Sequence, residues 1–351
     1  MSSVVTAYLG RAYRELRDEI LVLPSKTILL VFVVVILLIP VVTTQPYALH
    51  ILILASIFAI FAASWDLLSG FTGQMNFGHA LFFGVAAYTS ALLNLHLAWP
   101  HWVTIPLGAI AAVGAGLIIG VPCLRLRGPY LALATLAFPL ILTAVIYVFP
   151  EVTGGERGVS GIDALAGSRV VEYYLVVPLM LVLGFIMWKI TGSKTGIIFH
   201  AIREDEVAVR ASGINTTRYK LLAFSLSGLF AGIAGGLYVH YMRVASPIST
   251  LHILVSFQVI IWAIFGGIAT IYGPMVGVFI LVPLTQALTM VPVIRDLRML
   301  LFAVVVLLVL LFMPEGVTTW VRDKMEKECP RCKVRNFARR KQCRICMADL
   351  D

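Results

Sequence analysis

The chain has 351 residues, of which 60% are hydrophobic and 13% are Asp, Glu, Lys or Arg. Such a composition excludes a water-soluble globular domain and indicates a membrane protein with several spans. The 27 Lys and Arg residues outnumber the 18 Asp and Glu residues and give a formal net charge of +9. In a membrane protein an excess of this kind lies mainly in cytoplasmic loops, so nucleic acid is not an expected partner.

Apolar stretches long enough to cross a bilayer recur about ten times along the chain. We expect spans near residues 27–43, 48–68, 77–95, 102–121, 129–149, 172–190, 219–241, 253–270, 273–291 and 298–313. A re-entrant path for residues 70–95 is the alternative for the third span and would change the count. The predicted fold class is therefore all-α, a polytopic transmembrane helical bundle with a small C-terminal four-cysteine zinc finger.

The distribution of basic residues predicts the orientation of the spans. With a cytosolic N-terminus, all but five of the 27 Lys and Arg residues fall on the cytosolic side. This bias predicts a multi-pass protein of the cell (plasma or inner) membrane with both termini in the cytosol. We expect three parts: an amphipathic arm at 1–26 that lies on membrane lipids, a membrane domain at 27–318 and a cytosolic tail at 319–351.

A charged island interrupts the apolar sequence between residues 195 and 220. Its apolar residues recur at helical spacing, and Glu206 precedes Arg210 by four positions, the favoured order for an ion pair on a helix. Gly213 suits the left-handed position that ends a helix, and Asn215 suits the N-cap of the next one. The pattern predicts a short amphipathic helix, which is either a plain surface element or a docking site for a cytosolic partner.

Glycines interrupt another apolar run, between the predicted second and third spans. The candidates there are Gly70, Gly73, Gln74, Asn76, Gly78 and His79. A helix broken inside a membrane is tolerated where its backbone is buried in protein or lines a cavity, and its free N-terminus can attract a carboxylate. These six residues are therefore candidates for a translocation path. The alternative is a tight connection in which Asn76 caps the next helix and His79 is packed inside the protein.

Two further features of the apolar spans are informative. Gly228, Gly232 and Gly236 recur every fourth residue, a spacing that lets helices approach closely. Asp66 is the main ionisable residue away from the predicted span ends, and even it lies near one. Such scarcity argues against a proton-coupled transporter, because proton pathways need ionisable groups inside the membrane.

Four of the five cysteines lie in the tail. Cys329, Cys332, Cys343 and Cys346 form the pattern C-x2-C-x10-C-x2-C. Paired thiolates at this spacing bind Zn²⁺ tetrahedrally, and a cytosolic tail disfavours disulfides, so we predict a structural Zn²⁺ site. The residues between the pairs resemble short four-cysteine fingers of the Ran-binding type. Lys327 stands where those fingers carry a tryptophan, which favours a structural or protein-binding role over RNA binding.

Several of these strings together resemble one family of membrane proteins. They are the stretch from His200 to Glu206, Gly213-Ile214-Asn215, Arg218-Tyr219-Lys220 and the stretch from Gly70 to Ala80. Over roughly residues 27–318 the chain resembles the branched-chain amino acid ABC transporter permeases. His200 departs from the arginine usual there, and the four-cysteine tail is not part of the family pattern.

The resemblance implies roles and partners. The loop at 196–213 resembles the coupling helix that seats on the ATPase subunit, and the matching positions are Ala201, Arg203, Glu204, Asp205, Glu206 and Gly213. The implied partners are two ABC ATPase subunits, a second permease subunit and an extracytoplasmic substrate-binding protein. ATP would be bound and hydrolysed on the ATPase subunits alone, so the chain itself is expected to be a transport subunit and not an enzyme.

Three other functions remain as alternatives. The same family includes permeases for urea and short amides, which these motifs do not separate from amino acid permeases. A membrane-anchored zinc-finger scaffold would use the spans only as an anchor. A membrane enzyme would need an acid/base or metal constellation among the spans, and the seven histidines are scattered without one.

Overall fold

The computed structural model describes residues 24–123, 126, 128–290, 297–338, 340–343 and 345–350. The predicted arm at 1–26 lies outside these residues except for its last three. The chain divides into two compact units, one formed by residues up to Thr43 together with those from Val317, the other by Thr44–Gly316. Each unit is described separately below.

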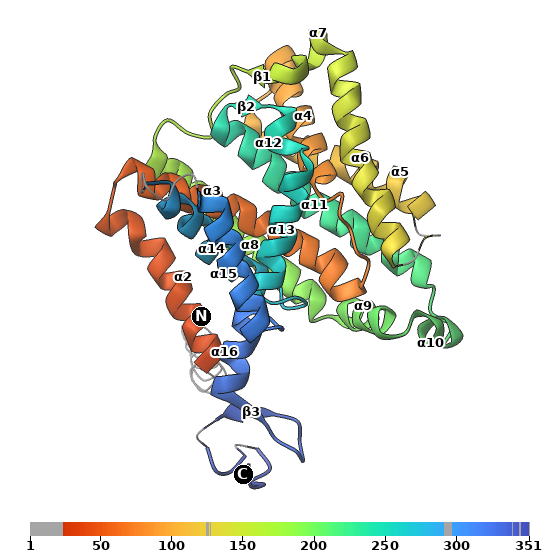
Figure 1. Cartoon of the computed structure of the whole chain (residues 1–351), viewed down its shortest axis with the longest axis vertical. Helices are drawn as coiled ribbons and strands as arrows, with labels where there is room; N and C mark the ends of the chain where they lie inside the picture. The colour runs from red at the N-terminus through yellow and green to blue at the C-terminus, as the bar shows by residue number, and fades with distance from the viewer. Residues whose placement is uncertain are drawn as a thin grey trace, which may run out of the picture. The chain divides into compact units, whose positions relative to one another are not determined.

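The larger unit is almost entirely helical (Figure 1). Its longer helices are α3 (Pro46–Trp65), α4 (Ala80–Leu97), α5 (His101–Cys123), α6 (Pro129–Val148), α8 (Arg169–Thr191), α11 (Thr216–Met242), α13 (Ile253–Gly266), α14 (Tyr272–Met290) and α15 (Arg298–Phe312). The shorter elements are the π-helical turn η2 (Asp66–Gly70), α7 (Pro150–Thr153), the 3₁₀ turn η3 (Gly155–Arg157), α9 (Lys194–Glu204), α10 (Glu206–Ala211) and α12 (Pro247–Thr250).

Within the described residues, eight helical stretches are long and apolar enough to cross a membrane. The predicted all-α membrane bundle is therefore confirmed, while eight stretches stand against about ten expected. The remaining two expected spans correspond to α15, which has 15 residues, and to α2 of the other unit, whose apolar part is Leu30–Val42. The third expected span is one continuous helix, α4, and is among the eight.

The glycines on one face of α11 allow this helix to pack closely against α5 in the larger unit. A Cβ added at Gly232 would lie 2.7 Å from the Cα of Ala109 on α5, and one at Gly236 would lie 3.2 Å from the Cα of Ile105. Only hydrogen side chains allow backbones to approach this closely. The predicted packing role of these glycines is thus confirmed. Beside this pair, almost every residue of α3 from Ile53 to Trp65 is buried.

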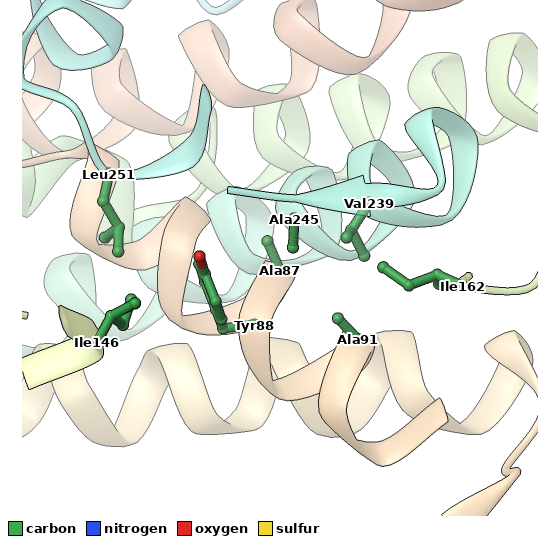
Figure 2. Close-up of a cluster of buried hydrophobic side chains, with 8 residues drawn as sticks. All are labelled: Ala87, Tyr88, Ala91, Ile146, Ile162, Val239, Ala245 and Leu251. Carbon is green, nitrogen blue, oxygen red and sulfur yellow. The ribbon is translucent and has the colours of Figure 1, made fainter. Parts of the chain in front are cut away.

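At one end of the helices, short connecting segments cover a cluster of buried apolar side chains (Figure 2). Strand β1 (Val159–Ser160) pairs antiparallel with β2 (Val244–Ala245). Tyr88, Leu251 and Ile162 of the loop after β1 belong to this buried cluster. The His240 ring is tied to the same loop, since its Nδ1 lies 2.9 Å from the carbonyl oxygen of Asp163. This loop is therefore held by both apolar and polar contacts.

The smaller unit contains α2 (Pro24–Val42), α16 (Val317–Met325) and a hairpin of β3 (Glu326–Glu328) with β4 (Arg335–Phe337). The hairpin is antiparallel, with Lys327 opposite Asn336. It carries the first two cysteines in its loop. The described residues that follow β4 form turns and irregular segments, and the four cysteines cluster together.

The carboxylate of Asp66 connects η2 to the turn between α13 and α14. It accepts hydrogen bonds from the backbone N–H groups of Ala269 (2.7 Å), Thr270 (3.1 Å) and Ile271 (3.0 Å). Ala269 and Ile271 have φ values of 60° and 56°, so the turn is strained and its N–H groups converge as in an anion-binding nest. Gly70 leaves room for the Asp66 carboxylate, because a Cβ added at this position would lie 1.9 Å from Asp66 Oδ1. The fully buried Asp66 therefore has a structural role here.

We predict that Asp66→Ala lowers the melting temperature of the purified protein by about 5–10 °C. Loss of the Asp66 carboxylate leaves three inward-facing N–H groups without an acceptor, which lowers the free energy of unfolding by about 3 kcal/mol. Glu151→Ala, at an exposed acid of α7, serves as the control and should change the melting temperature little. Equal melting temperatures for the two variants would contradict the structural role of Asp66.

Candidate functional site

The glycine-interrupted stretch that was predicted as a translocation path lies where α3 ends. The helix continues through η2 to Thr72, breaks at Gly73 and restarts at Ala80. Gly73 has a φ of 69°, which favours glycine. Gly78 passes so close to α6 that a Cβ would lie 1.9 Å from the carbonyl oxygen of Thr135. Both glycines are thus required by the geometry of the irregular stretch at 73–79, which we call the break.

Side chains from several helices satisfy the backbone of the break. Trp65 Nε1 donates to the Asn76 carbonyl at 2.7 Å, and Ser69 Oγ donates to the Gln74 carbonyl at 2.9 Å. The Phe77 N–H donates to Thr135 Oγ1 at 3.1 Å. These contacts replace the hydrogen bonds that a helix would make with itself, so the break is stable although it is not helical.

The start of α4 does not present free N–H groups. The Ala80 N–H donates to Ser256 Oγ of α13 at 2.9 Å, and the next two N–H groups donate to the carbonyls of Gly78 and His79. The sequence suggested that this helix end could attract a carboxylate. In this conformation its N–H groups are occupied by the protein itself.

His79 and Asn76 form a buried pair. Ser64 Oγ donates its proton to the Phe61 carbonyl, so it accepts from His79 Nε2 at 2.9 Å. His79 Nδ1 is then the acceptor for Asn76 Nδ2 at 3.4 Å, while Asn76 Oδ1 accepts the Gly78 N–H. The His79 ring stacks on Phe61 with a centroid distance of 4.9 Å. The pair is therefore a neutral, satisfied network, and Asn76 bonds within the break instead of capping α4.

Gln74 differs from its neighbours in the break. Its side chain is 4% exposed, and its Nε2 donates to Thr72 Oγ1 at 3.2 Å. Its Oε1 has no hydrogen-bond partner in the described part of the chain. A buried carbonyl oxygen without a donor costs about 1–3 kcal/mol. Gln74 Oε1 is thus an acceptor in the break that is open to a ligand or to a rearrangement of the segment.

The short amphipathic helix predicted between residues 195 and 220 is wrong in one respect: the segment consists of two helices. Asp205 has an extended backbone, ends α9 and begins α10. Its carboxylate accepts from the N–H groups of Val207 (2.8 Å) and Ala208 (3.0 Å), which caps α10. Because an N-cap residue leaves helical geometry, the chain turns at Asp205. We call α9 and α10 together the elbow.

The end of the elbow follows the predicted pattern. Gly213 has a φ of 82°, its N–H donates to the Arg210 carbonyl, and the Ile214 N–H donates to the Val209 carbonyl. These two bonds form a Schellman motif. Asn215 Oδ1 then accepts from the Arg218 N–H and caps α11.

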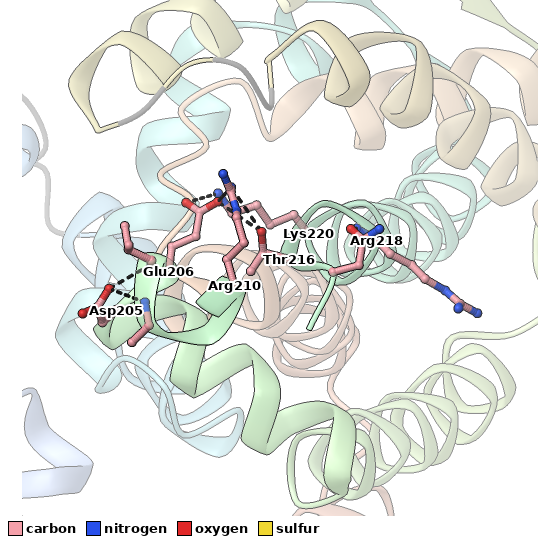
Figure 3. A network of polar contacts seen from close by, with 9 residues as sticks. Asp205, Glu206, Arg210, Thr216, Arg218 and Lys220 are labelled. Atoms are coloured by element: carbon pink, nitrogen blue, oxygen red, sulfur yellow. Dashed lines mark hydrogen bonds and ion pairs between the residues drawn. The ribbon is translucent and has the colours of Figure 1, made fainter. Parts of the chain in front are cut away.

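An ion-pair network holds the elbow against α11 (Figure 3). Glu206 bonds Arg210 at 2.7 Å and Lys220 at 2.6 Å, and Thr216 Oγ1 lies 3.3 Å from both Glu206 and Arg210. Lys220 is buried, so its charge requires this partner. The predicted pair of Glu206 with Arg210 is present, whereas Lys220 was not predicted because it comes from the next helix.

The elbow contacts the other predicted site, the stretch that begins at Gly70 and includes the break. Arg203 of α9 donates through its Nη1 to the carbonyl oxygen of Gly70 at 2.6 Å, and its Cγ would lie 3.1 Å from a Cβ at Gly73. The ring of His200 packs edge-on against Phe71 with a centroid distance of 4.9 Å. Burial, and then the charge of Arg203, lowers the pKa of His200, so this ring is neutral at pH 7. The elbow is thus joined directly to the end of η2.

The outer surface of the elbow carries the remaining predicted residues. Glu204 and Gly213 are exposed, and Ala201 is partly buried. Val207 is 65% exposed, although it is apolar. No described residue pairs with the Glu204 carboxylate. The elbow therefore has an inner side that is bonded to the protein and an outer side that is open.

The four tail cysteines come together as their spacing predicts. Their sulfur atoms all lie within 4.8 Å of one another, with Cys329 and Cys346 at 3.5 Å and Cys332 and Cys343 at 3.4 Å. A tetrahedron with metal–sulfur bonds of about 2.3 Å has edges of about 3.8 Å, so these thiols fit a metal ion. The N–H groups of Cys346 and Ile345 lower the pKa of Cys343 to about 6, which favours the thiolate that a metal needs.

Comparison with known proteins gives the family. The family described as "branched-chain amino acid transport system / permease component" matches residues 47–310. The high-affinity branched-chain amino acid transport system permease protein LivM of Salmonella typhimurium is 28% identical over 309 residues, which cover 79% of this chain and 71% of that protein.

More distant relatives include two other permeases. LivH of Escherichia coli K12, from the high-affinity branched-chain amino acid transport system, is 24% identical over 296 residues, or 78% of this chain and 94% of that protein. The ribose import permease protein RbsC of Escherichia coli K12 is 28% identical over 225 residues, or 60% of this chain and 70% of that protein. The comparison with solved structures gave no match.

The matched residues include both the break and the elbow, while the four tail cysteines lie beyond them. The match covers most of the chain, and the described helices meet the length and composition of membrane spans. This chain therefore belongs to the branched-chain amino acid transport system permease family and is a multi-pass membrane protein.

Proposed function

We propose that this chain is a permease subunit of an ABC importer for branched-chain amino acids. The family match and the relatives named LivM and LivH support this substrate class. The proposal includes two ATPase subunits, a second permease subunit and an extracytoplasmic binding protein as partners. It places the chain in the cell (inner) membrane with both termini in the cytosol, and it assigns ATP hydrolysis to the ATPase subunits.

The observation that carries the proposal is the hydrogen bond between Arg203 and the Gly70 carbonyl. An ATPase docked on the outer side of the elbow would contact Glu204 and Val207. A movement of the elbow would keep α10 bonded to α11, because Glu206 bonds both Arg210 of α10 and Lys220 of α11. That movement would reach the end of η2 through Arg203, and from there the break. Such a connection is what alternating access driven from outside the membrane domain requires.

The first experiment measures uptake of labelled leucine in cells with and without the gene, with urea and ribose as parallel solutes. Loss of leucine uptake alone is the expected result. Loss of urea uptake with unchanged leucine uptake would assign the chain to the urea and amide branch of the family. Unchanged uptake of all three solutes would contradict the importer and favour a scaffold.

We predict that Glu204→Ala lowers leucine uptake about tenfold, while the amount and melting temperature of the protein stay unchanged. Glu204 is exposed and forms no ion pair in the described chain, so its loss affects mainly a docked partner. Arg203→Ala should lower uptake similarly, because it removes the bond to the Gly70 carbonyl. Glu151→Ala is the matched control at an exposed acid outside the elbow. Normal ATP-driven uptake in both elbow variants would contradict the coupling role.

We further propose that the tail binds one Zn²⁺ through Cys329, Cys332, Cys343 and Cys346. The ion would cross-link the hairpin loop to the last turns of the chain, and a segment this short needs such a link to fold. The purified full-length protein should contain about one zinc ion per chain. Cys332→Ser should lose the ion, and Cys123→Ser, at a buried cysteine of α5, should keep it. Zinc bound equally by both variants would contradict the assignment.

A further inference from the structure

A cavity of about 480 Å³ lies where the start of α9 meets the first turns of α11. The residues that line it are Thr195, Arg218, Tyr219, Leu221, Leu222 and Ser225. It shares no residue with the break, with the ion-pair network of Glu206 or with the four cysteines. Its size is in the range of small-ligand sites.

The polar groups in this cavity lack protein partners. Within the described residues, no acceptor bonds the guanidinium of Arg218, and none bonds the hydroxyl groups of Tyr219 and Thr195. The neighbouring cations differ, since Glu206 bonds both Arg210 and Lys220. In Figure 3 the side chain of Arg218 runs away from that network. Three kinds of donor residue thus line one cavity.

The charge that lines the cavity is positive, because Arg218 is its charged residue. None of the six lining residues is an Asp or a Glu. Thr195 is the second residue of α9 and Arg218 is the third residue of α11, so both lie at the positive ends of helix dipoles. The donors and the charge together favour an anionic group rich in oxygen, and an arginine is well suited to a phosphate.

The other wall of the cavity is apolar. Leu221 and Leu222 follow Arg218 by one turn and lie within the candidate span Thr216–Met242, and Leu222 is 39% exposed. A ligand that fills the whole cavity therefore has an anionic head beside Arg218 and a hydrocarbon part beside the leucines. A free phosphate would use only the first half.

We propose that this cavity binds the phosphate group of an anionic phospholipid. Arg218 is the charged partner of the phosphate, Tyr219 and Thr195 donate hydrogen bonds to its oxygens, and Leu221 and Leu222 contact the acyl chains. The bound lipid joins the start of α9 to α11. This place is the end of α9 opposite Arg203. The lipid site shares no residue with the break, and it therefore does not depend on which solute is transported.

The test uses native mass spectrometry of the full-length protein, titrated with phosphatidylglycerol or with phosphatidylcholine. The wild-type protein should retain phosphatidylglycerol in preference to phosphatidylcholine. Arg218→Gln should bind phosphatidylglycerol about tenfold more weakly, which corresponds to about 1.4 kcal/mol. Tyr219→Phe keeps the ring packed on Phe199 and should weaken binding by a smaller factor. Lys189→Gln, at an exposed base near the end of α8, is the matched control and should bind as wild type.

Each alternative outcome has a defined meaning. Equal retention of phosphatidylglycerol by wild type and Arg218→Gln overturns the site, as does equal retention of the two lipids by wild type. A parallel titration with glycerol 3-phosphate separates the source of the phosphate: binding of this soluble ester as strong as that of the lipid overturns the phospholipid assignment. Equal melting temperatures of the lipid-free variants show that any loss of binding is not a loss of fold.

Discussion

Backbone hydrogen bonding inside the membrane domain is the constraint on which the rest of this structure depends. A helix satisfies its own N–H and carbonyl groups, but a break does not, and each unsatisfied group costs free energy in apolar surroundings. The break at 73–79 and the start of α4 are stable because Trp65, Ser69, Thr135 and Ser256 supply the missing partners. These four side chains come from separate elements, so the break also determines how those elements are packed together.

The charged residues near the break follow the same principle. Asp66 accepts three backbone N–H groups, and Arg203 donates to a backbone carbonyl, so both charges are used to satisfy main-chain groups. One connects η2 to the turn between α13 and α14, and the other connects it to the elbow. The turn η2 is thus held at its first residue, Asp66, and at its last, Gly70. A displacement of the elbow would be transmitted to a segment that is already fixed to the opposite helices.

The first helix of the elbow, α9, has a role near each of its ends. Arg203 lies at its bend and reaches Gly70, while Thr195 at its start borders the cavity with Arg218. Between them, Phe199 and Ile202 are buried, so the inner face of α9 is anchored by apolar packing as well. Only the outer side is left open, and this asymmetry agrees with a segment that receives a partner on one side and acts on its own protein on the other.

Features that depend on neighbours in the chain could be predicted from the sequence by itself. The helical class, the end of the elbow at Gly213, the cap at Asn215 and the pair of Glu206 with Arg210 all follow from residues a few positions apart. The convergence of the four cysteines was likewise expected, because two C-x2-C pairs at this spacing are typical of a tetrahedral Zn²⁺ site. The glycine face of α11 was visible in its four-residue spacing.

Only the tertiary structure decided which distant groups meet. Arg203 reaches Gly70 across 133 positions, and Asp66 reaches Ala269 across 203. Nothing local selects these partners, since the choice depends on how the helices pack in three dimensions. The bend at Asp205 was missed for a related reason: the apolar spacing continues through it, whereas the capping carboxylate and the packing of each half against different neighbours turn the chain there. The sequence determined the helical class and the local caps, because these depend on neighbouring residues, and packing determined the bend at Asp205 and the connections that relate the elbow to the break.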